Sequence, residues 1–494
     1  LTSRFGYWQA QSSPISLDTG GGQNAITETF ESDNDQRDMS AEYRRPFAGS
    51  GSLMIAFVDA EQNQESENSL TEDGNLRSSI SNRESGETAA RLLITQPLNE
   101  RLTIRTEATT AFNFFEGGFQ LFENGVELPV ANSDNRVEED RRSVEASVDW
   151  NLSEKWTFSS SVGIESYEIT SRVASSGTQT DPKGDLSLSF RPAARTTFSL
   201  ESSRSIGQLS FNQFLASSSL SSEIVTAGAA ALEPERQWTH AAIYDRRFGD
   251  AGVMRFELQR QIVDNPVNSV ALSDSITVAQ NTSEEQIDRI RARIEFPFER
   301  FGREDFVLSV QGNIAQSNTI DPVTGESREV SGVQTRDWGL DFRRDPGDGN
   351  LAWGASIRDR EDGDDFSVRR TGSREESSDW DAFVEWEPIR GLKLRTQVQG
   401  PTTSVRTSRF FPAVRSPGLD PSFIATTRTE QDSSASFTVE WRRREHFEIR
   451  ASLSSRPRIR STETLTPFGE TVGSIQTTEF AETPRATLRF RFYR

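Results

Sequence analysis

Few residues of the sequence could perform covalent chemistry. It contains two histidines, His240 and His446, and no cysteine. Acid–base or nucleophilic catalysis needs a nucleophile beside a base, or a paired acid and base, at one place. His240 falls in a predicted strand, Trp238–Tyr244, and His446 lies at a predicted tight turn. No convergence of this kind is evident, so we expect no enzyme activity and no cofactor.

One acidic segment, Asp359–Asp365, has the oxygen ligands that calcium prefers. Its carboxylates lack the spacing of an EF-hand, and no closing glutamate follows at the required position. We therefore predict no specific metal site. A solvated outer loop, which divalent ions could bridge to lipopolysaccharide, is the favoured interpretation.

Aromatic residues gather in three polar stretches that we predict to be loops or loop entrances. Two interpretations stay open: the rings enclose an incoming ligand, or they pack the loops against one another. Packing is favoured, and ligand binding is kept as the functional hypothesis. The candidate ligand-binding residues are Phe114, Phe115, Phe119, Phe122, Phe211, Phe214, Phe410 and Phe411.

The elements that must position these residues show a period of two along the whole chain. Val144, Ala146, Val148 and Trp150 alternate with polar residues, and so do the apolar residues of 290–296 and 435–441. Helical spacing would mix the apolar and polar residues on one face, whereas strand spacing separates them. The sequence therefore predicts an all-β protein.

Alternation alone does not distinguish a soluble sandwich from a membrane barrel, but the connections do. Tight turns, such as those at 45–49, 98–100, 152–154 and 248–251, alternate with long polar segments at 11–37, 115–140 and 206–234. Short turns at one rim and long loops at the other are typical of outer-membrane barrels. We predict a transmembrane antiparallel up-and-down β-barrel of about 20–22 strands, with short periplasmic turns and long extracellular loops.

The two faces of such a wall carry different residues. Tryptophans near the tight turns, on the apolar face, are predicted to form a periplasmic aromatic girdle: Trp150, Trp156, Trp353, Trp386 and Trp441. Charged residues on the other face are predicted to line the lumen and to pair across strands: Arg289, Arg291, Arg293, Glu295, Glu440, Arg489 and Arg491.

Composition agrees with a wall that is one residue thick. Only 33% of the residues are hydrophobic, the mean hydropathy is -0.62 and the formal net charge is -20, yet there are 32 Phe and 9 Trp. No apolar run is long enough for a transmembrane helix. The acidic balance argues against nucleic-acid binding. We expect one barrel domain over residues 1–494, with no plug domain in this chain.

Short motifs resemble the barrel of TonB-dependent outer-membrane receptors. Leu232–Gln237 followed by a strand that ends Tyr244–Gly249 resembles one segment of that family, and Leu186–Pro192 followed by Arg195–Phe198 resembles its hairpins. The terminal Leu488–Phe492 is similar to the strand that the insertion machinery recognises, although Tyr493 and Arg494 follow it. Unlike the family, the chain shows neither a plug nor a TonB box, and its strand count falls slightly below twenty-two.

The resemblance implies a multi-pass barrel in the cell outer membrane of a Gram-negative bacterium. It would take up a scarce nutrient such as a metal chelate, vitamin or oligosaccharide, energised through the TonB complex. The alternative is a porin-like or scaffolding barrel whose lumen conducts solutes or holds a partner protein. Expected partners are outer-membrane lipid and lipopolysaccharide, and a plug segment or separate chain that fills the lumen.

Overall fold

The computed structural model describes most of the chain. The described residues are 2–19, 26–47, 50–72, 75–172, 175–219, 224–229, 231–249, 252–273, 276–298, 303–344, 351–443, 447–455, 457–469, 474–481 and 484–492. Within them the only helix is a short 3-10 turn, η1 (Phe211–Phe214). No helix in this part of the chain has the length and apolar character needed to span a membrane.

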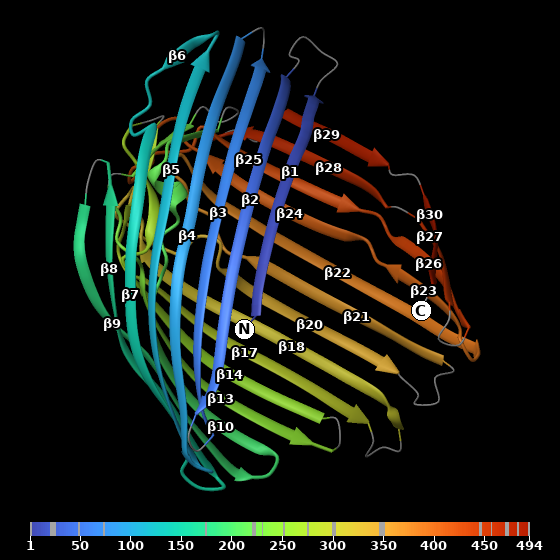
Figure 1. The fold of residues 1–494 in the computed structure, drawn as a ribbon. Coiled ribbons are helices and arrows are strands. Elements are labelled where there is room, and N and C mark those ends of the chain that lie inside the picture. The colour runs from blue at the N-terminus through green and yellow to red at the C-terminus, as the bar shows by residue number, and fades with distance from the viewer. Residues whose placement is uncertain are drawn as a thin grey trace. The chain divides into compact units, whose positions relative to one another are not determined.

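The chain divides into two compact units, which are considered separately. Unit 1 comprises residues 1–190, 200–240 and 261–285, and unit 2 comprises residues 191–199, 241–260 and 286–494. Unit 1 contains long neighbouring strands that run side by side from β1 to β5 (Figure 1).

The strands of unit 1, with the four that are divided between the units, come first in the chain. They are β1 (Thr2–Thr19), β2 (Ile26–Phe47), β3 (Gly51–Glu72), β4 (Asn75–Asn99), β5 (Leu102–Glu123), β6 (Val126–Leu128), β7 (Asp134–Asn151), β8 (Trp156–Ser171), β9 (Ser175–Ala193), β10 (Thr196–Ile206), β11 (Ser217–Ser219), β12 (Ile224–Ala227), β13 (Arg236–Phe248), β14 (Gly252–Asp264), β15 (Val267–Ala271) and β16 (Ile276–Asn281).

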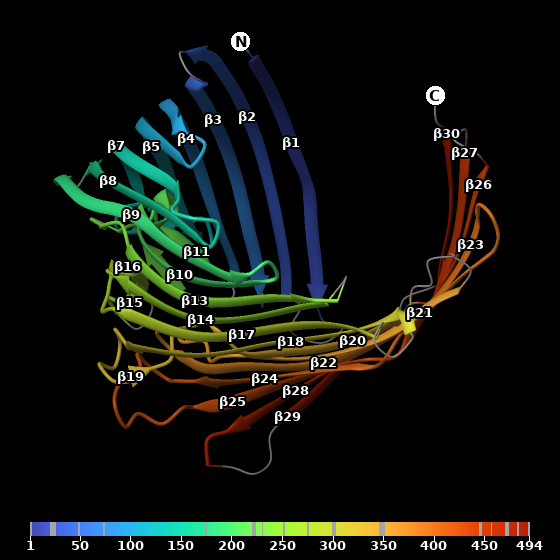
Figure 2. The same cartoon turned by 90° about the horizontal axis from the view of Figure 1, so that it is seen from below.

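Unit 2 contains the remaining strands. They are β17 (Glu285–Phe298), β18 (Arg303–Ile320), β19 (Ser327–Arg328), β20 (Gln334–Arg344), β21 (Leu351–Asp362), β22 (Arg370–Ile389), β23 (Leu392–Gln399), β24 (Thr402–Phe410), β25 (Phe423–Gln431), β26 (Ser434–Arg443), β27 (Phe447–Ser454), β28 (Arg458–Pro467), β29 (Ser474–Ala481) and β30 (Arg485–Phe492). β23, β26, β27 and β30 pair in that order and lie side by side (Figure 2).

The main sheet confirms the predicted architecture. It contains 26 strands, and all of its described pairings are antiparallel. β6 and β19 are short strands within connections, and four sequential pairs, from β23/β24 to β29/β30, are each one strand with a short break. About twenty continuous strands remain, as the sequence predicts.

The tight turns are where the sequence places them, but two of the long loops are mostly strand. β4 and β5 are joined through residues 100–101, and β7 and β8 through residues 152–155. The prediction of a loop over 11–37 is wrong, because β1 extends to Thr19 and β2 begins at Ile26. The segment 115–140 is likewise strand except for the connection between β5 and β7. The segment 206–234 is a long connection, as expected.

Large apolar side chains are exposed on one face of the paired strands. Val162 is 70% exposed, Ile164 58% and Leu200 61% in unit 1, while Ile290 is 54% exposed and Leu488 62% in unit 2. A soluble sandwich would bury these residues between its sheets. In the described strands this apolar face is uncovered, as a face that contacts lipid requires.

Candidate functional site

The face opposite to the apolar one is covered in part of unit 1 by a segment of the chain itself. This covering segment comprises the described residues 207–219, 224–229 and 231–235, between β10 and β13, and includes η1, β11 and β12. Pleating places Phe115, Gly117 and Phe119 of β5 on the face opposite to Phe112, which is 36% exposed. The covering segment packs on that opposite face.

The first contact is a hydrophobic cluster beneath the middle of the covering segment. Phe115 and Phe119 of β5 pack with Leu215 and Ala216, which are 1% and 0% exposed. Phe211 lies against Phe115, with their ring centroids 6.4 Å apart. Leu215 therefore fills space directly above β5, since a Cβ added to Gly117 would lie 2.9 Å from its Cδ2 atom.

A second cluster continues the contact onto β7 and β8. Phe214 of η1 is fully buried against Val137, Tyr167 and Ile169, together with Leu232 from the end of the segment. The ends and the middle of the covering segment are thus held on the same surface. Apolar burial of this kind is the main stabilising term for such a contact.

Several buried polar groups beneath the segment have hydrogen-bond partners. The Asn135 amide, which is fully buried, donates to the carbonyl oxygen of Phe214 at 3.0 Å, and the Asn132 amide donates to that of Gly228 at 2.7 Å. Glu139, also fully buried, accepts from Asn113 and pairs with Arg141. Burying these groups costs little because each has a partner.

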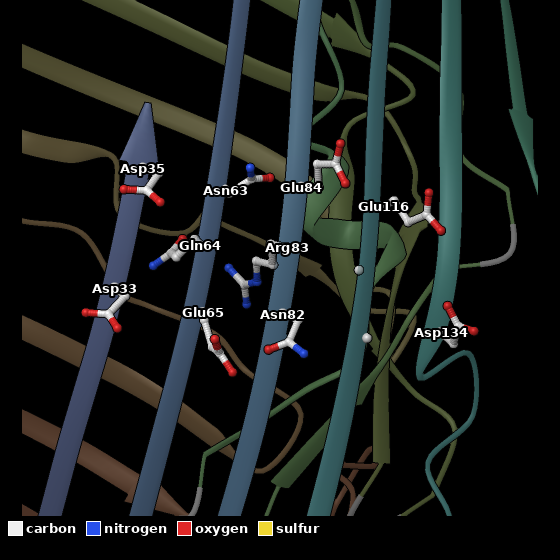
Figure 3. A pocket seen from close by; sticks show the side chains of 12 residues that line it. Asp33, Asp35, Asn63, Gln64, Glu65, Asn82, Arg83, Glu84, Glu116 and Asp134 are labelled. Carbon is white, nitrogen blue, oxygen red and sulfur yellow. The ribbon is translucent and has the colours of Figure 1, made fainter. Parts of the chain in front are cut away.

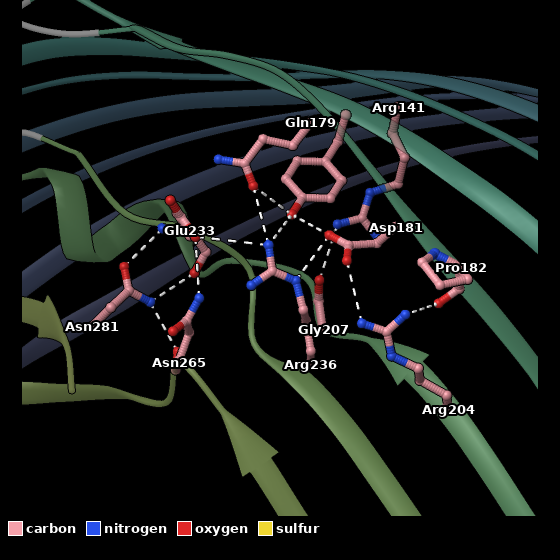
Figure 4. A network of polar contacts seen from close by, with 11 residues as sticks. Arg141, Gln179, Asp181, Pro182, Arg204, Gly207, Glu233, Arg236, Asn265 and Asn281 are labelled. Atoms are coloured by element: carbon pink, nitrogen blue, oxygen red, sulfur yellow. Dashed lines mark hydrogen bonds and ion pairs between the residues drawn. The ribbon is translucent and has the colours of Figure 1, made fainter. Parts of the chain in front are cut away.

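A polar network joins the end of the covering segment to β8 and β9 (Figure 4). Arg236 donates to Asp181 at 2.8 Å, and the Tyr167 hydroxyl donates to the same carboxylate at 3.1 Å. Asn281, the last residue of β16, donates hydrogen bonds to the carbonyl oxygens of Glu233 and Asn265, each at 2.8 Å. The hydrogen bonds to the Asp181 carboxylate are charge-assisted, and such bonds fix geometry as well as adding stability.

A cavity of about 600 Å³ lies on the outer surface of β2–β7, lined by twelve residues (Figure 3). The strand register forms two rows across it, Asp33–Glu65–Asn82–Gly118–Asp134 and Asp35–Asn63–Glu84–Glu116. Pleating puts both rows on the same face as the apolar residues but nearer the other end of the strands. Six carboxylates therefore face this cavity.

The cavity is acidic without being a metal site. Arg136 and Arg172 both pair with Glu116 at 2.7 Å, so part of the negative charge is neutralised. Arg83 donates hydrogen bonds to Ser81 and to Asn212 of the covering segment. Among the described residues no three acidic or histidine side chains are close enough to hold a metal ion.

Three connections of unit 2 meet at a buried ion pair, which we name the loop clasp (Asp321, Arg415, Arg328, Phe366 and Ser367). Arg415 donates to Asp321 at 2.6 Å and to the carbonyl oxygen of Ser367 at 2.7 Å. The Arg328 guanidinium lies 3.5 Å from Asp321 and over the Phe366 ring. Asp321 is 2% and Arg415 5% exposed.

The charge of Asp321 is stabilised by this surrounding. Burial disfavours the charged form, but hydrogen bonds from Arg415 and the Val323 backbone N–H, with the charges of Arg415 and Arg328, outweigh it and lower the pKa of Asp321. The clasp therefore holds an ionised carboxylate at neutral pH.

The predicted aromatic residues occupy different places. Phe115, Phe119 and Phe214 are buried in the two clusters, and Phe211 packs beside them. Phe114 lies on the other face, stacked with Phe112 and beneath Arg136. Phe122, Phe410 and Phe411 are partly exposed, and Phe410 stacks on Phe423 at 4.7 Å.

The predicted lumen charges lie on the face opposite to the exposed apolar residues. Arg291 pairs with Glu257 at 2.8 Å, Arg293 pairs with Glu295, and Glu440 pairs with Arg442. Arg289 shares this face of β17. Arg489 and Arg491 alternate on β30 with Leu488 and Phe490, which are 62% and 57% exposed.

The girdle tryptophans lie next to the tight turns on the apolar face. Trp150, Trp156, Trp386 and Trp441 are 45%, 39%, 49% and 40% exposed. Trp353 is partly buried against Phe306 and Phe342. Their position at a membrane interface stays a prediction.

The histidines and the acidic segment 359–365 were the other residues considered for catalysis or metal binding. His240 accepts or donates a hydrogen bond with Ser202 at 3.0 Å and stacks on Trp238, and within the described residues no carboxylate contacts its ring. His446 lies outside the described residues. In the acidic segment, Asp359 and Glu361 pair with Arg336, and Asp365 pairs with Arg370.

The sequence analysis did not predict the contact of the covering segment with β5, β7 and β8, nor the loop clasp. One sequence pattern does indicate the contact of the covering segment, because the stretch 112–122 carries apolar residues at both even and odd positions. A strand with only one covered face shows apolar residues at alternate positions alone. No local pattern marks Asp321 and Arg415, which are 94 residues apart.

No family model matches the sequence, and no curated protein matches it. Among solved structures, the copper transporter OprC aligns over 81% of this chain and 74% of its own, with a TM-score of 0.51 and 10% identity. The hemophore receptor HasR of Serratia marcescens, in complex with its hemophore HasA and heme, aligns over 80% and 76%, with a TM-score of 0.47 and 10% identity.

The alcaligin outer-membrane receptor FauA of Bordetella pertussis aligns over 81% of this chain with a TM-score of 0.47 and 8% identity. This chain covers 65% of FauA, so it is similar to only about two thirds of that protein. The likeness to OprC concerns the fold, which agrees with the strand order, the pairing and the exposed apolar face. The chain has the antiparallel β-barrel fold of TonB-dependent outer-membrane receptors.

Proposed function

We propose that the protein is an outer-membrane transport barrel that takes up a scarce nutrient, energised through the TonB complex. The single observation that carries the proposal is the uncovered apolar face, with large side chains such as Val162 70% exposed, on a chain with the fold of OprC. An apolar face of this kind is stable in lipid and unstable in water. No chemical bond changes in the proposed function.

The nutrient belongs to the class of metal chelates, vitamins or oligosaccharides. The partly exposed aromatic residues Phe410 and Phe411 are the proposed ligand contacts, because the buried ones already pack against protein and Phe122 lies on the apolar face of β5. Phe411→Ala should lower uptake without changing folding. Phe468→Ala is the matched control, since Phe468 is 49% exposed in another connection.

Uptake by intact cells tests the proposal directly. A strain lacking the protein and a complemented strain would be supplied with ferric chelates, cupric ion, cobalamin and maltodextrin as probes. We expect the accumulation of one probe class to require the protein, and to stop when TonB is removed or an uncoupler collapses the proton gradient. If accumulation requires the protein but is unchanged by the uncoupler, the porin-like alternative would be favoured.

A plug or partner chain in the lumen belongs to the same proposal. Barrels of about twenty strands are too wide for their own side chains to fill. Purification of the native protein from outer membranes should therefore recover polypeptide beyond residues 1–494, either continuous with the chain or as a separate subunit. A preparation of residues 1–494 alone with full energised uptake would contradict this part of the proposal.

A further inference from the structure

The covering segment shares its surface with the predicted pathway. In a barrel whose apolar face contacts lipid, the opposite face of β5, β7 and β8 lines the interior. The covering segment rests on that interior face through Leu215, Phe214 and Leu232, each no more than 1% exposed. The described residues of the covering segment therefore occupy interior space that the strands themselves leave open.

The contact is close as well as extensive. A Cβ added to Gly228 would lie 2.3 Å from the carbonyl oxygen of Phe214 in the same segment, and 2.9 Å from that of Asn132 in the connection before β7. The Asn132 and Asn135 amides bond to carbonyl oxygens of the segment, and Arg141 bonds to Gly207 at its start. Main chain and wall are thus in direct contact along the segment.

The neighbouring connection extends the same structure. β11 and β12 of the covering segment pair with each other, and β12 pairs in parallel with β16. Since β16 also pairs with β15, the two connections together form one four-stranded sheet. Thr226 and Thr277 hydrogen-bond between these strands at 3.1 Å. A lid that opens would have to break this sheet and expose both hydrophobic clusters.

We propose that the covering segment, in its described residues 207–219, 224–229 and 231–235, forms a fixed constriction inside the barrel that limits the size of the solutes that pass. The inference rests on the proposed transport function, but it concerns what this chain itself contributes to selectivity. Any plug or partner would pack beside this constriction. The apolar anchors Phe214 and Leu215 are its positioning residues.

The first test is the conductance of the purified 494-residue chain in planar bilayers, with neutral polyethylene glycols of graded size as probes. The double variant Phe214→Asp/Leu215→Asp should release the segment, raise single-channel conductance about twofold or more, and admit larger polymers. Heat-modifiable gel mobility reports whether the barrel is folded. A folded variant with unchanged conductance and polymer cut-off would overturn the constriction.

A second test leaves the anchors intact and uses the absence of cysteine from the sequence. Asn212→Cys places a thiol on η1, where Asn212 is exposed, and a bulky methanethiosulfonate reagent should then lower the conductance at least about twofold. The matched control is Glu326→Cys, an exposed position in a connection of unit 2, where labelling should change nothing. Equal effects at both positions would overturn the proposal.

The outcomes separate the inference from the function on which it rests. A chain that inserts and conducts, but in which release and labelling have no effect, loses only the constriction. A chain that neither inserts into bilayers nor conducts contradicts the proposed transport function itself.

Discussion

At the scale of single residues, the loop clasp shows how one carboxylate can organise three connections. Asp321 accepts from Arg415, which is 94 residues away, and also from the backbone N–H of Val323. Removing one partner of a buried ion pair leaves the other charge without compensation, which costs about 3–5 kcal/mol. The clasp should therefore depend on Asp321 far more than on exposed pairs nearby.

Asp321→Asn is expected to loosen the connections at 321–333, 363–369 and 411–422. Limited proteolysis of the folded protein should cut these connections much faster in the variant. Asp365→Asn is the matched control, because its pair with Arg370 is partly exposed and therefore contributes less than the buried pair. Equal cleavage in the two variants would show that the clasp does not hold the connections.

The same pair predicts a pH dependence. The pKa of Asp321 is lowered in the folded protein, so its contribution to stability is complete above the ordinary carboxyl range and is lost as pH falls through the lowered pKa. Cleavage of these connections should stay slow down to about pH 4 and rise only in more acid solution. Faster cleavage already near pH 6 would contradict the assignment.

At the scale of elements, the breaks within strands are as informative as the strands. β22 pairs with β23 through its second half and with β24 through its first half, and the break falls at Gly400. A Cβ at Gly400 would lie 2.0 Å from the Trp380 indole nitrogen, so the indole would have to shift. The glycine is thus required by close packing on β22.

Gly400→Ala should destabilise the protein by about 1–3 kcal/mol through overpacking. The yield of heat-modifiable protein after refolding into vesicles measures this effect. Gly312→Ala is the control, because a Cβ added there meets nothing within 4 Å. If the two alanine variants refold equally well, the packing assigned to Gly400 is wrong.

The sequence predicts the strands where one face is apolar, but it does not predict their polar extensions. The alternation at 144–150 marks β7, whereas the polar stretch 11–37 reads as a loop although it is mostly β1 and β2. Beyond a lipid-facing band both faces of a strand are wet, so hydrogen-bonded pairing continues without a hydrophobic pattern. The covering segment was unpredictable for another reason, since its position depends on tertiary contacts of Leu215 and Phe214.

At the scale of the whole molecule, the proposed location assigns a side of the membrane to each connection. The turn Asp321–Glu326 is fixed by backbone hydrogen bonds, and a Cβ added to Gly325 at its tip would meet nothing within 4 Å. A short epitope inserted beside Gly325 should bind antibody on intact cells. Binding only after the outer membrane is permeabilised would invert the proposed topology.

The central claim, that the apolar face contacts lipid, is tested most directly by comparing arginine substitutions on the two faces. Arginine at the bilayer midplane of a barrel costs about 2–4 kcal/mol on the lipid side. Val148→Arg and Phe437→Arg should therefore impair folding into lipid vesicles, while their neighbours Ser147→Arg and Thr438→Arg fold nearly as the wild type does. Equal losses on both faces would contradict the account.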